Sequence, residues 1–345
     1  GRFDLSKVSE KYLGPRSTES SRIARSLEND LKIAPHSIME NADRNLSQTE
    51  SVILRHLIGR RKIGTQFETD GKTALILTSS LNAGGAERQV ILTSSGLRNE
   101  GWESVIGVDR IDAQHSGETL WGMAESLDLD VIEFRDEDLE SDEAENIIQL
   151  HENILSNLRP IERERSECII RMILKTQPSV IHAWQDAMIY PAAIANYIVG
   201  SSVLVGSVRS LNPDEKSLLH GRKRPFLRRS LRMLCDADGF VLLNNSQAGR
   251  ESYAKWLSVS ENGIKVVRNG VIFDECEGID MKSILDIPSD SKLIGGVFRL
   301  VPEKRPILWV DSAWECIKNR KNVFAVIIGE GRMRKEVENR IEEIG

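Results

Sequence analysis

Cysteine is scarce in this 345-residue chain, and its spacing excludes two common kinds of site. The four cysteines lie far apart and form no CxxC pair, namely Cys168, Cys235, Cys276 and Cys316. This spacing favours neither a zinc site nor a disulfide framework, and a reducing cytosol fits it best. No other His, Cys, Asp or Glu falls at metal-ligand spacing, so we expect no metal and no other cofactor.

Long apolar runs and an excess of positive charge are also lacking. No run approaches the ~18 residues that a membrane span needs, and the start carries no secretory signal. The formal net charge of −6 argues against bulk nucleic-acid binding. We expect a cytoplasmic protein, free or peripheral to the inner face of the membrane. Because the chain begins with Gly1 and stops just after a helical pattern, we also expect that both ends are cut.

The remaining composition is that of a globular protein, with 40% hydrophobic and 28% charged residues. The length favours two domains. Residues 1–70 carry no strand signal, but 20–33 and 48–61 space their apolar residues at helical intervals. We interpret residues 1–70 as a helical accessory region of unassigned function.

From residue 73 onward, short apolar runs alternate with helical stretches. Strands are predicted at 73–80, 104–109, 130–135, 179–184, 203–208 and 239–244. Apolar strands with helical crossovers predict a parallel sheet covered on both faces. The right-handed crossover rule makes this unit Rossmann-like.

A second series of the same kind follows residue 265. It comprises predicted strands at 265–270, 293–298 and 322–329 and helices at 302–319 and 332–344. We therefore expect an α/β protein with two Rossmann-like domains, at 71–270 and 271–345, and a cleft between them. Open α/β sheets bind ligands at the carboxyl ends of their strands.

Two charged stretches are set apart from these elements. Residues 133–146 hold a dense run of carboxylates, which we interpret as a solvated loop. Residues 209–233 are rich in Arg and Lys. They form either a solvated cationic helix face or a surface for anionic lipid headgroups or a phosphorylated acceptor.

Glycines follow the first strand, in the stretch SSLNAGGAERQV. Gly84 and Gly85 stand where the next helix begins, with Glu87 in its first turn. Such glycines let backbone N–H groups approach an anion at the positive end of a helix. A tight turn with a good helix start explains them equally well, and no GxGxxG dinucleotide fingerprint is present.

Two cations follow the predicted strand 293–298. Arg299 and Lys304 belong to the stretch GGVFRLVPEKRP, at the carboxyl edge of the second sheet. Arg offers a planar fork of donors and Lys a compact charge. Fixed cations in a dry cleft stabilise the negative charge of a departing diphosphate. Surface charge on a loop is the competing interpretation.

Other candidates also stand at strand ends. Glu330 and Gly331 form a second turn of close approach, where the Glu330 carboxylate accepts a bond from a sugar hydroxyl or simply favours the helix start. His182 lies at the end of the predicted strand 179–184, and Trp184 and Asp186 come after this histidine in the sequence. His182 is a candidate for binding a hydroxyl, although a lone histidine is more often a packed or surface residue. No GxSxG elbow or nucleophilic cysteine signature is present.

Taken together, five stretches resemble a family 4 glycosyltransferase with the GT-B fold. They are NAGGAERQV, NNSQAGRE, VVRNGV, FRLVPEKRP and VIIGEGRMRKEVE, which occur in the order of that family and span residues 73–345. Family members are sugar transferases with nucleotide-sugar donors, generally retaining at the anomeric carbon and usually independent of metals.

The resemblance implies roles for individual residues. Arg299 and Lys304 would hold the donor diphosphate and act in catalysis. Gly84 and Gly85 would lie near the donor phosphate and sugar, and Glu330 with Gly331 near the nucleotide. His182 matches the first histidine of a strand-end motif whose second histidine is Trp184 here. With Asp186 and the lesser candidate Arg209, these two residues make up the expected acceptor side.

Two further departures from the family pattern concern the second half. The glycine before the arginine is Phe298 here. The E-x7-E donor motif of the family is expected downstream of residue 345. Glu330 and Glu338 have its spacing, but we interpret that as coincidence. A chain that lacks this motif would lack half of its donor pocket and would be inactive.

We therefore expect a retaining glycosyltransferase of surface polysaccharide or glycolipid assembly. Its partners would be a nucleotide-sugar donor and a glycan or lipid-linked acceptor. Residues 209–233 are the candidate segment for peripheral contact with a membrane. We expect no nucleic-acid partner. Two alternatives stay open: a GT-B nucleotide-sugar epimerase, and a catalytically inactive scaffold or binding protein.

Overall fold

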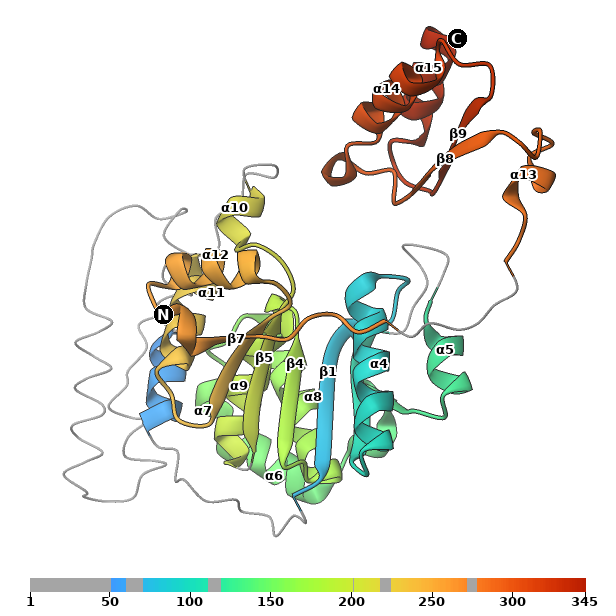
Figure 1. Ribbon diagram of the computed structural model, residues 1–345. Coiled ribbons are helices and arrows are strands. Elements are labelled where there is room, and N and C mark those ends of the chain that lie inside the picture. Colours follow the sequence, from blue (N-terminus) through green and yellow to red (C-terminus); the bar gives the residue numbers. More distant parts are fainter. Residues whose placement is uncertain (1–50, 60–70, 111–118, 201, 218–224, 272–277) are drawn as a thin grey trace, which may run out of the picture. The chain divides into compact units, whose positions relative to one another are not determined.

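Strand β1 (Thr73–Ser80) is buried along its first six residues. The computed structural model in which it lies describes residues 51–59, 71–110, 119–200, 202–217, 225–271 and 278–345 (Figure 1). Leu75 and Leu77 pack into one apolar cluster, whereas Ile76 packs into another. Because side chains alternate along a strand, β1 is apolar on both faces, and each face needs a covering layer.

Six further strands join β1 in one parallel sheet with the order β3-β2-β1-β4-β5-β6-β7. They are β2 (Glu103–Arg110), β3 (Asp130–Glu133), β4 (Val180–Trp184), β5 (Val203–Val208), β6 (Phe240–Asn244) and β7 (Ile264–Val266). The order reverses between β1 and β4, as in doubly wound nucleotide-binding folds. The predicted parallel sheet is confirmed, although the strand predicted over 265–270 already ends at Val266.

Helices cover this sheet (Figure 1). They are α4 (Gly85–Asn99), α5 (Trp121–Ser126), α6 (Asp142–Leu150), α7 (Glu152–Leu155), α8 (Pro160–Thr176), α9 (Asp186–Val199), α10 (Pro213–Ser217), α11 (Pro225–Cys235) and α12 (Gln247–Leu257), with 3-10 turns η1 (Glu137–Leu139) and η2 (Glu261–Gly263). Helices α4 and α5 supply the cluster around Ile76. Helices α8, α9, α11 and α12 supply the larger cluster.

The N-terminal stretch predicted to be helical lies largely outside the described residues, including 20–33. Within the predicted helix 48–61, residues 51–59 are helical. Ile53, Leu54 and Leu57 of this helix belong to the larger cluster. The helix is therefore part of the main core.

A second compact unit runs from Ile272 to Gly345, and the first from Gly1 to Val271. The second contains α13 (Met281–Ile284), β8 (Lys292–Val297), η3 (Pro302–Lys304), α14 (Pro306–Ile317), β9 (Val323–Ile328) and α15 (Arg334–Ile344). Strands β8 and β9 pair in parallel. Leu300, Val310 and Val337 form the centre of its core.

The helix predicted over 302–319 is wrong as one continuous element. Residues 302–304 form η3, and α14 begins only at Pro306. Between them Arg305 has a left-handed backbone with φ of 52°. The residue before a proline is disfavoured in the right-handed helical region, so the chain breaks there.

The loop predicted over the carboxylate run 133–146 is also wrong in part. Helix α6 begins at Asp142 after the cap of Ser141, whose Oγ accepts a hydrogen bond from the Ala144 N–H at 3.2 Å. Carboxylates are favourable in the first turn of a helix, and Ala144 and Ile148 supply a buried side. The charges themselves remain solvated, as predicted.

Helix α11 begins in the basic stretch 209–233 and ends two residues after it. Leu227, Leu231 and Leu234 are buried in the larger cluster, whereas Arg228 and Arg229 are exposed. This arrangement fits a solvated cationic face, and membrane contact stays a prediction. Within the parts of the chain that the structure describes, no helix is both long and apolar enough to cross a bilayer.

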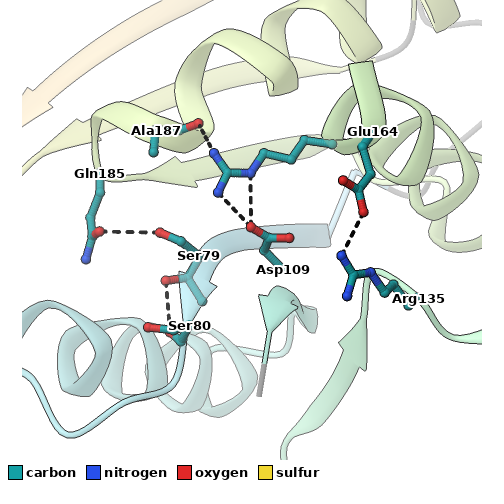
Figure 2. A network of polar contacts seen from close by, with 9 residues as sticks. Ser79, Ser80, Asp109, Arg135, Glu164, Gln185 and Ala187 are labelled. Atoms are coloured by element: carbon teal, nitrogen blue, oxygen red, sulfur yellow. Dashed lines mark hydrogen bonds and ion pairs between the residues drawn. The ribbon is translucent and has the colours of Figure 1, made fainter. Parts of the chain in front are cut away.

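A buried ion pair connects the end of β2 to α8. Arg165 donates to Asp109 Oδ2 from Nε at 3.0 Å and from Nη2 at 2.6 Å, and from Nη1 to the Ala187 carbonyl at 3.4 Å. The two side chains are only 12% and 7% exposed. Figure 2 shows Asp109 in this network, with the exposed pair Arg135–Glu164 nearby.

We predict that Asp109→Asn lowers the free energy of unfolding by about 3–5 kcal/mol, because it leaves the Arg165 charge buried and uncompensated. Urea unfolding measures this change. The matched control is Arg135→Gln, which breaks the exposed pair with Glu164 and should cost at most about 1 kcal/mol. Equal costs for the two variants would contradict the assignment.

Candidate functional site

Arg209 and Trp184 form a stacked pair at the carboxyl ends of β4 and β5. The Arg209 guanidinium carbon lies 4.3 Å from the centre of the Trp184 ring. Arg209 Nη2 also donates to Asn269 Oδ1, which brings in the loop after β7. Trp184 is only 3% exposed. The indole is therefore buried, whereas the Arg209 side chain that stacks on it is only partly exposed.

His182 lies beside this pair. Its ring centroid is 5.0 Å from that of Trp184, and its Nε2 is 3.0 Å from Ser207 Oγ on β5. Burial, aided by the charge of Arg209, lowers the pKa of His182 to about 3. The imidazole is therefore neutral near pH 7. It suits a hydrogen bond better than an ion pair with a ligand.

Asp186 is the fourth residue predicted on the acceptor side. It opens α9, and its Oδ1 accepts a hydrogen bond from the Tyr253 hydroxyl at 2.7 Å. Tyr253 is fully buried on α12. This hydrogen bond connects α9 to α12. Asp186 therefore stabilises the packing of these two helices, whether or not it also contacts a ligand.

The glycine turn after β1 is occupied by a carboxylate. Gly84 is the N-cap of α4, and a Cβ built on it would lie 2.2 Å from Glu87 Oε2. Glu87 Oε1 accepts from Gln185 Nε2 at 2.8 Å. Gly85 is exposed, with open space where a side chain would be. An anion that approaches Gly84 must therefore displace Glu87, whereas Gly85 is open.

Three residues of this edge escaped the sequence analysis. Gln185 has an unusual φ of 65°, and its Oε1 accepts from Ser79 Oγ at 3.5 Å (Figure 2). Gln89 makes two hydrogen bonds to the Gly270 backbone, at 2.7 and 2.8 Å. Asn269 contacts Arg209. A strained backbone outside glycine often marks a functional site, but the sequence gives no signal for it here.

In the second unit, Arg299 lies two residues after the end of β8, and Lys304 ends η3 five residues later. Both residues are exposed. Over the described ranges, neither side chain makes an ion pair or a hydrogen bond with another side chain. The predicted placement at the carboxyl end of a strand is found, but their role in binding a diphosphate stays a prediction.

The loop that carries Arg299 lies against the loop after β9. Leu300 N–H donates to the Glu330 carbonyl at 2.8 Å, and Phe298 N–H to the Ile328 carbonyl at 3.1 Å. A Cβ on Gly329 would lie 1.9 Å from the Phe298 carbonyl oxygen, and one on Gly331 2.4 Å from that of Leu300. These glycines thus allow two backbones to touch, and they bring Glu330 and Gly331 next to Arg299.

The Glu330 carboxylate forms an ion pair with Arg334 of α15. Arg334 Nε also donates to Glu338 Oε1 at 2.8 Å. Both carboxylates of the E-x7-E spacing are thus engaged by one exposed arginine. The interpretation of the spacing as coincidence stays a prediction. Across the described ranges, no group of three or more His, Cys, Asp or Glu side chains is placed to hold a metal ion.

Comparison with known proteins identifies the fold. No protein-family model matches the chain. The Vi polysaccharide biosynthesis protein VipC/TviE of Salmonella typhi is 25% identical over 199 residues, covering 56% of this chain and 34% of that protein. The chain thus spans about a third of the length of this relative.

Two solved structures share the architecture. A glycosyltransferase from Rickettsia africae ESF-5 matches with a TM-score of 0.55 and 15% identity, over 80% of this chain and 65% of that chain. Sucrose-phosphate synthase from Thermosynechococcus elongatus matches with a TM-score of 0.55 and 14% identity, over 79% of this chain and 68% of that chain. At such identities the likeness shows the fold: the chain has the GT-B architecture of glycosyltransferases, as its motifs predicted.

We predict that His182 makes the protein less stable in acid. The unfolded chain protonates this histidine near its ordinary pKa of ~6.5, whereas the folded protein does so only near 3. Stability therefore falls as the pH drops from about 6.5 toward 3. Between pH 7 and pH 4.5, His182→Gln should lose about 2.5 kcal/mol less unfolding free energy than the unmodified protein. Urea unfolding at both pH values tests this, and identical losses would refute it.

We predict that Gly329→Ala loosens the second unit. The added methyl group meets the Phe298 carbonyl, and φ of 158° is unfavourable for alanine. The cost should be about 2 kcal/mol or more, seen as faster hydrogen exchange of the β8 and β9 amides. The control is Gly295→Ala in β8, where a Cβ meets nothing within 4 Å. Equal protection in the two variants would disprove the close-approach role.

Proposed function

We propose that the protein is a glycosyltransferase that transfers a sugar from a nucleotide-diphosphate sugar to a glycan or lipid-linked acceptor. The observation that carries the proposal is the pair of exposed cations, Arg299 and Lys304, after a parallel strand of a GT-B fold. The name of the Salmonella relative, a polysaccharide biosynthesis protein, suggests assembly of surface polysaccharide or glycolipid as the process.

Arg299 and Lys304 would act on the leaving group. A nucleotide diphosphate gains negative charge as its bond to the sugar breaks, and cations fixed in advance stabilise that charge. The planar guanidinium suits two phosphate oxygens at once, whereas the ammonium acts as a point charge. With these cations the reaction needs no metal, and we propose retention at the anomeric carbon by resemblance to family 4.

The edge of the seven-stranded sheet would bind the acceptor. Neutral His182 and the partly exposed Arg209 would supply hydrogen-bonding groups there. Gly85 would admit the donor near the α4 N-terminus, where the helix dipole favours phosphate. The neighbouring Gly331 and Glu330 would contact the nucleotide, once Glu330 exchanges its exposed ion pair with Arg334, which is worth little in water.

Two other functions make different predictions. A nucleotide-sugar epimerase of the same fold would release free nucleotide without an acceptor product. An inactive scaffold would bind no nucleotide, and its helical N-terminal region would be the interaction module. Calorimetric titration with UDP, GDP and ADP separates the scaffold from the enzymes, because an enzyme should prefer one of the three.

We predict that Arg299→Ala and Lys304→Ala each reduce sugar transfer about 100-fold or more, because each removes a cation that stabilises the leaving group. Transfer is measured with the preferred donor, and nucleotide affinity by calorimetry. The control is Lys321→Ala, which removes an exposed cation before β9, at the opposite end of the strands. Normal turnover in both test variants would defeat the assignment.

A further inference from the structure

The chain leaves the first unit along residues 267–271, which we call the strap. These residues follow β7 and form neither helix nor strand. All of them are exposed, including Val267 and Val271, whose exposed fractions are 53% and 68%. Because its two valines remain in contact with water, burial of apolar surface contributes little to holding the strap. Its position depends on polar contacts instead.

Two of these contacts come from the ends of neighbouring strands. Val267 N–H donates to the carbonyl of Asn244, the last residue of β6, at 2.9 Å. Arg209, which follows β5, donates from Nη2 to Asn269 Oδ1. In Figure 1 the chain runs from β7 across the carboxyl ends of the strands toward α4. The strap therefore crosses the sheet edge at which we place the acceptor.

The last contact comes from Gln89 of α4, which engages both backbone polar groups of one residue. Gln89 Nε2 donates to the Gly270 carbonyl at 2.7 Å, and Gln89 Oε1 accepts from the Gly270 N–H at 2.8 Å. Gln89 is only 9% exposed, and a buried amide is costly unless its donor and acceptor are both satisfied. Gly270 satisfies both. This contact, the anchor, holds the strap as a neighbouring strand would, through its backbone.

The anchor lies directly before the boundary between the units. The first compact unit ends at Val271, one residue after Gly270, and the second begins at Ile272. Gln89 therefore fixes the point from which the connection to the second unit starts. If the contacts of Gln89 and Arg209 were lost, residues 268–271 would join that connection and lengthen its reach by roughly 13 Å. A longer tether lowers the effective concentration of one tethered part at the other.

We propose that Gln89 is a positioning residue for sugar transfer: by anchoring the strap, it restricts the range of positions that the second unit samples. The proposal rests on the proposed glycosyltransferase function, in which the first unit binds the acceptor and the second holds the leaving group through Arg299 and Lys304. Transfer requires both units at one place, and small errors in placement reduce the rate strongly. Gln89 acts through the strap and not on a substrate, so its loss lowers kcat and leaves nucleotide affinity unchanged.

The first test measures the anchor itself in the whole chain. Gln89→Leu removes both hydrogen bonds and keeps a side chain of similar size. We expect hydrogen exchange of the Gly270 amide to become at least about tenfold faster, and the radius of gyration from X-ray scattering to increase. The control is Gln247→Leu on the exposed side of α12, where the amide donates to Glu251 of the same helix at 2.8 Å. Unchanged exchange or unchanged scattering in Gln89→Leu overturns the proposal, as does an equal increase in the control.

A second pair of variants breaks the same anchor from the exposed strap, so it decides the question even if Gln89→Leu fails to fold. Gly270→Pro removes the N–H from which Gln89 accepts, and its scattering should change as in Gln89→Leu. Gly270→Ala keeps the N–H and the carbonyl, and its Cβ meets nothing within 4 Å. It should scatter like the unmodified protein. Identical scattering from the proline and alanine variants is the result that refutes the anchor.

The kinetic test separates positioning from stability. With the preferred donor, kcat should fall about tenfold in Gln89→Leu and in Gly270→Pro, while the calorimetric Kd for the nucleotide stays unchanged. A residue that serves stability alone lowers the unfolding midpoint without this split. A normal kcat, or nucleotide binding that weakens in step with the rate, contradicts the proposal.

The unmodified protein distinguishes this proposal from the one on which it rests. If it binds no nucleotide and transfers no sugar, yet Gln89→Leu speeds Gly270 exchange and expands the molecule, the restraint on the second unit stands and the glycosyltransferase function falls. If nucleotide binding and transfer are normal and the variants match the unmodified protein, the glycosyltransferase function stands and only the role of Gln89 is wrong.

Discussion

Parallel pairing of strands that are apolar on both faces is the constraint from which the rest of the molecule follows. Leu75 and Leu77 of β1 face one cluster, and Ile76 faces the other. A strand with no polar face must be covered twice, so helices connect the strands and all strands run in one direction. Polar side chains of the strand segments are then accommodated mainly in the loops at the carboxyl ends of the strands. Arg209 and Arg299 stand there for this reason, whereas His182 lies within β4, close to its carboxyl end.

Near the carboxyl ends of the strands, the neighbouring side chains determine whether an arginine is neutralised within the fold. Arg165 of α8 and Arg209 after β5 both contact residues near the carboxyl ends of strands, yet Asp109 neutralises the first and no described carboxylate contacts the second. A buried ion pair contributes to the structure because removing either partner is costly. A guanidinium oriented by an aromatic ring and an amide lacks that partner, so it can take one from a ligand. The same residue type thus serves the fold in one case and a proposed site in the other.

Sequence alone was sufficient wherever a local pattern determined the structure. The bounds of β1 and the start of α4 at Gly85 agree with the prediction, because an apolar run and two glycines define them. The break at Arg305 and the cap of Ser141 are also local. The sequence interpretation missed the first because helical spacing over 302–319 was given more weight than Pro306. It missed the second because the density of carboxylates over 133–146 was given more weight than a single serine.

The candidate site was only partly predictable, because its contacts join distant segments. Asn269 lies sixty residues beyond Arg209. Gln89 holds Gly270 across an even longer separation. The local sequence around Arg209 does not show that this residue stacks on Trp184 or that it has no neighbouring carboxylate. Positions at strand ends could be predicted, whereas neighbours across the sheet edge required the structure.

The two proposed cation sites differ in how strongly each can attract an anion in the present conformation. Arg299 and Lys304 are exposed, and in water the attraction between unit charges a few ångströms apart is only about 1 kcal/mol. Their proposed catalytic role therefore requires that water be excluded when the donor binds, since a lower dielectric strengthens the same interaction several-fold. Arg209 is already partly withdrawn from water by Trp184. It can thus select an anion before any such change, which makes it the better placed of the three for recognition, and the exposed pair the better placed for catalysis.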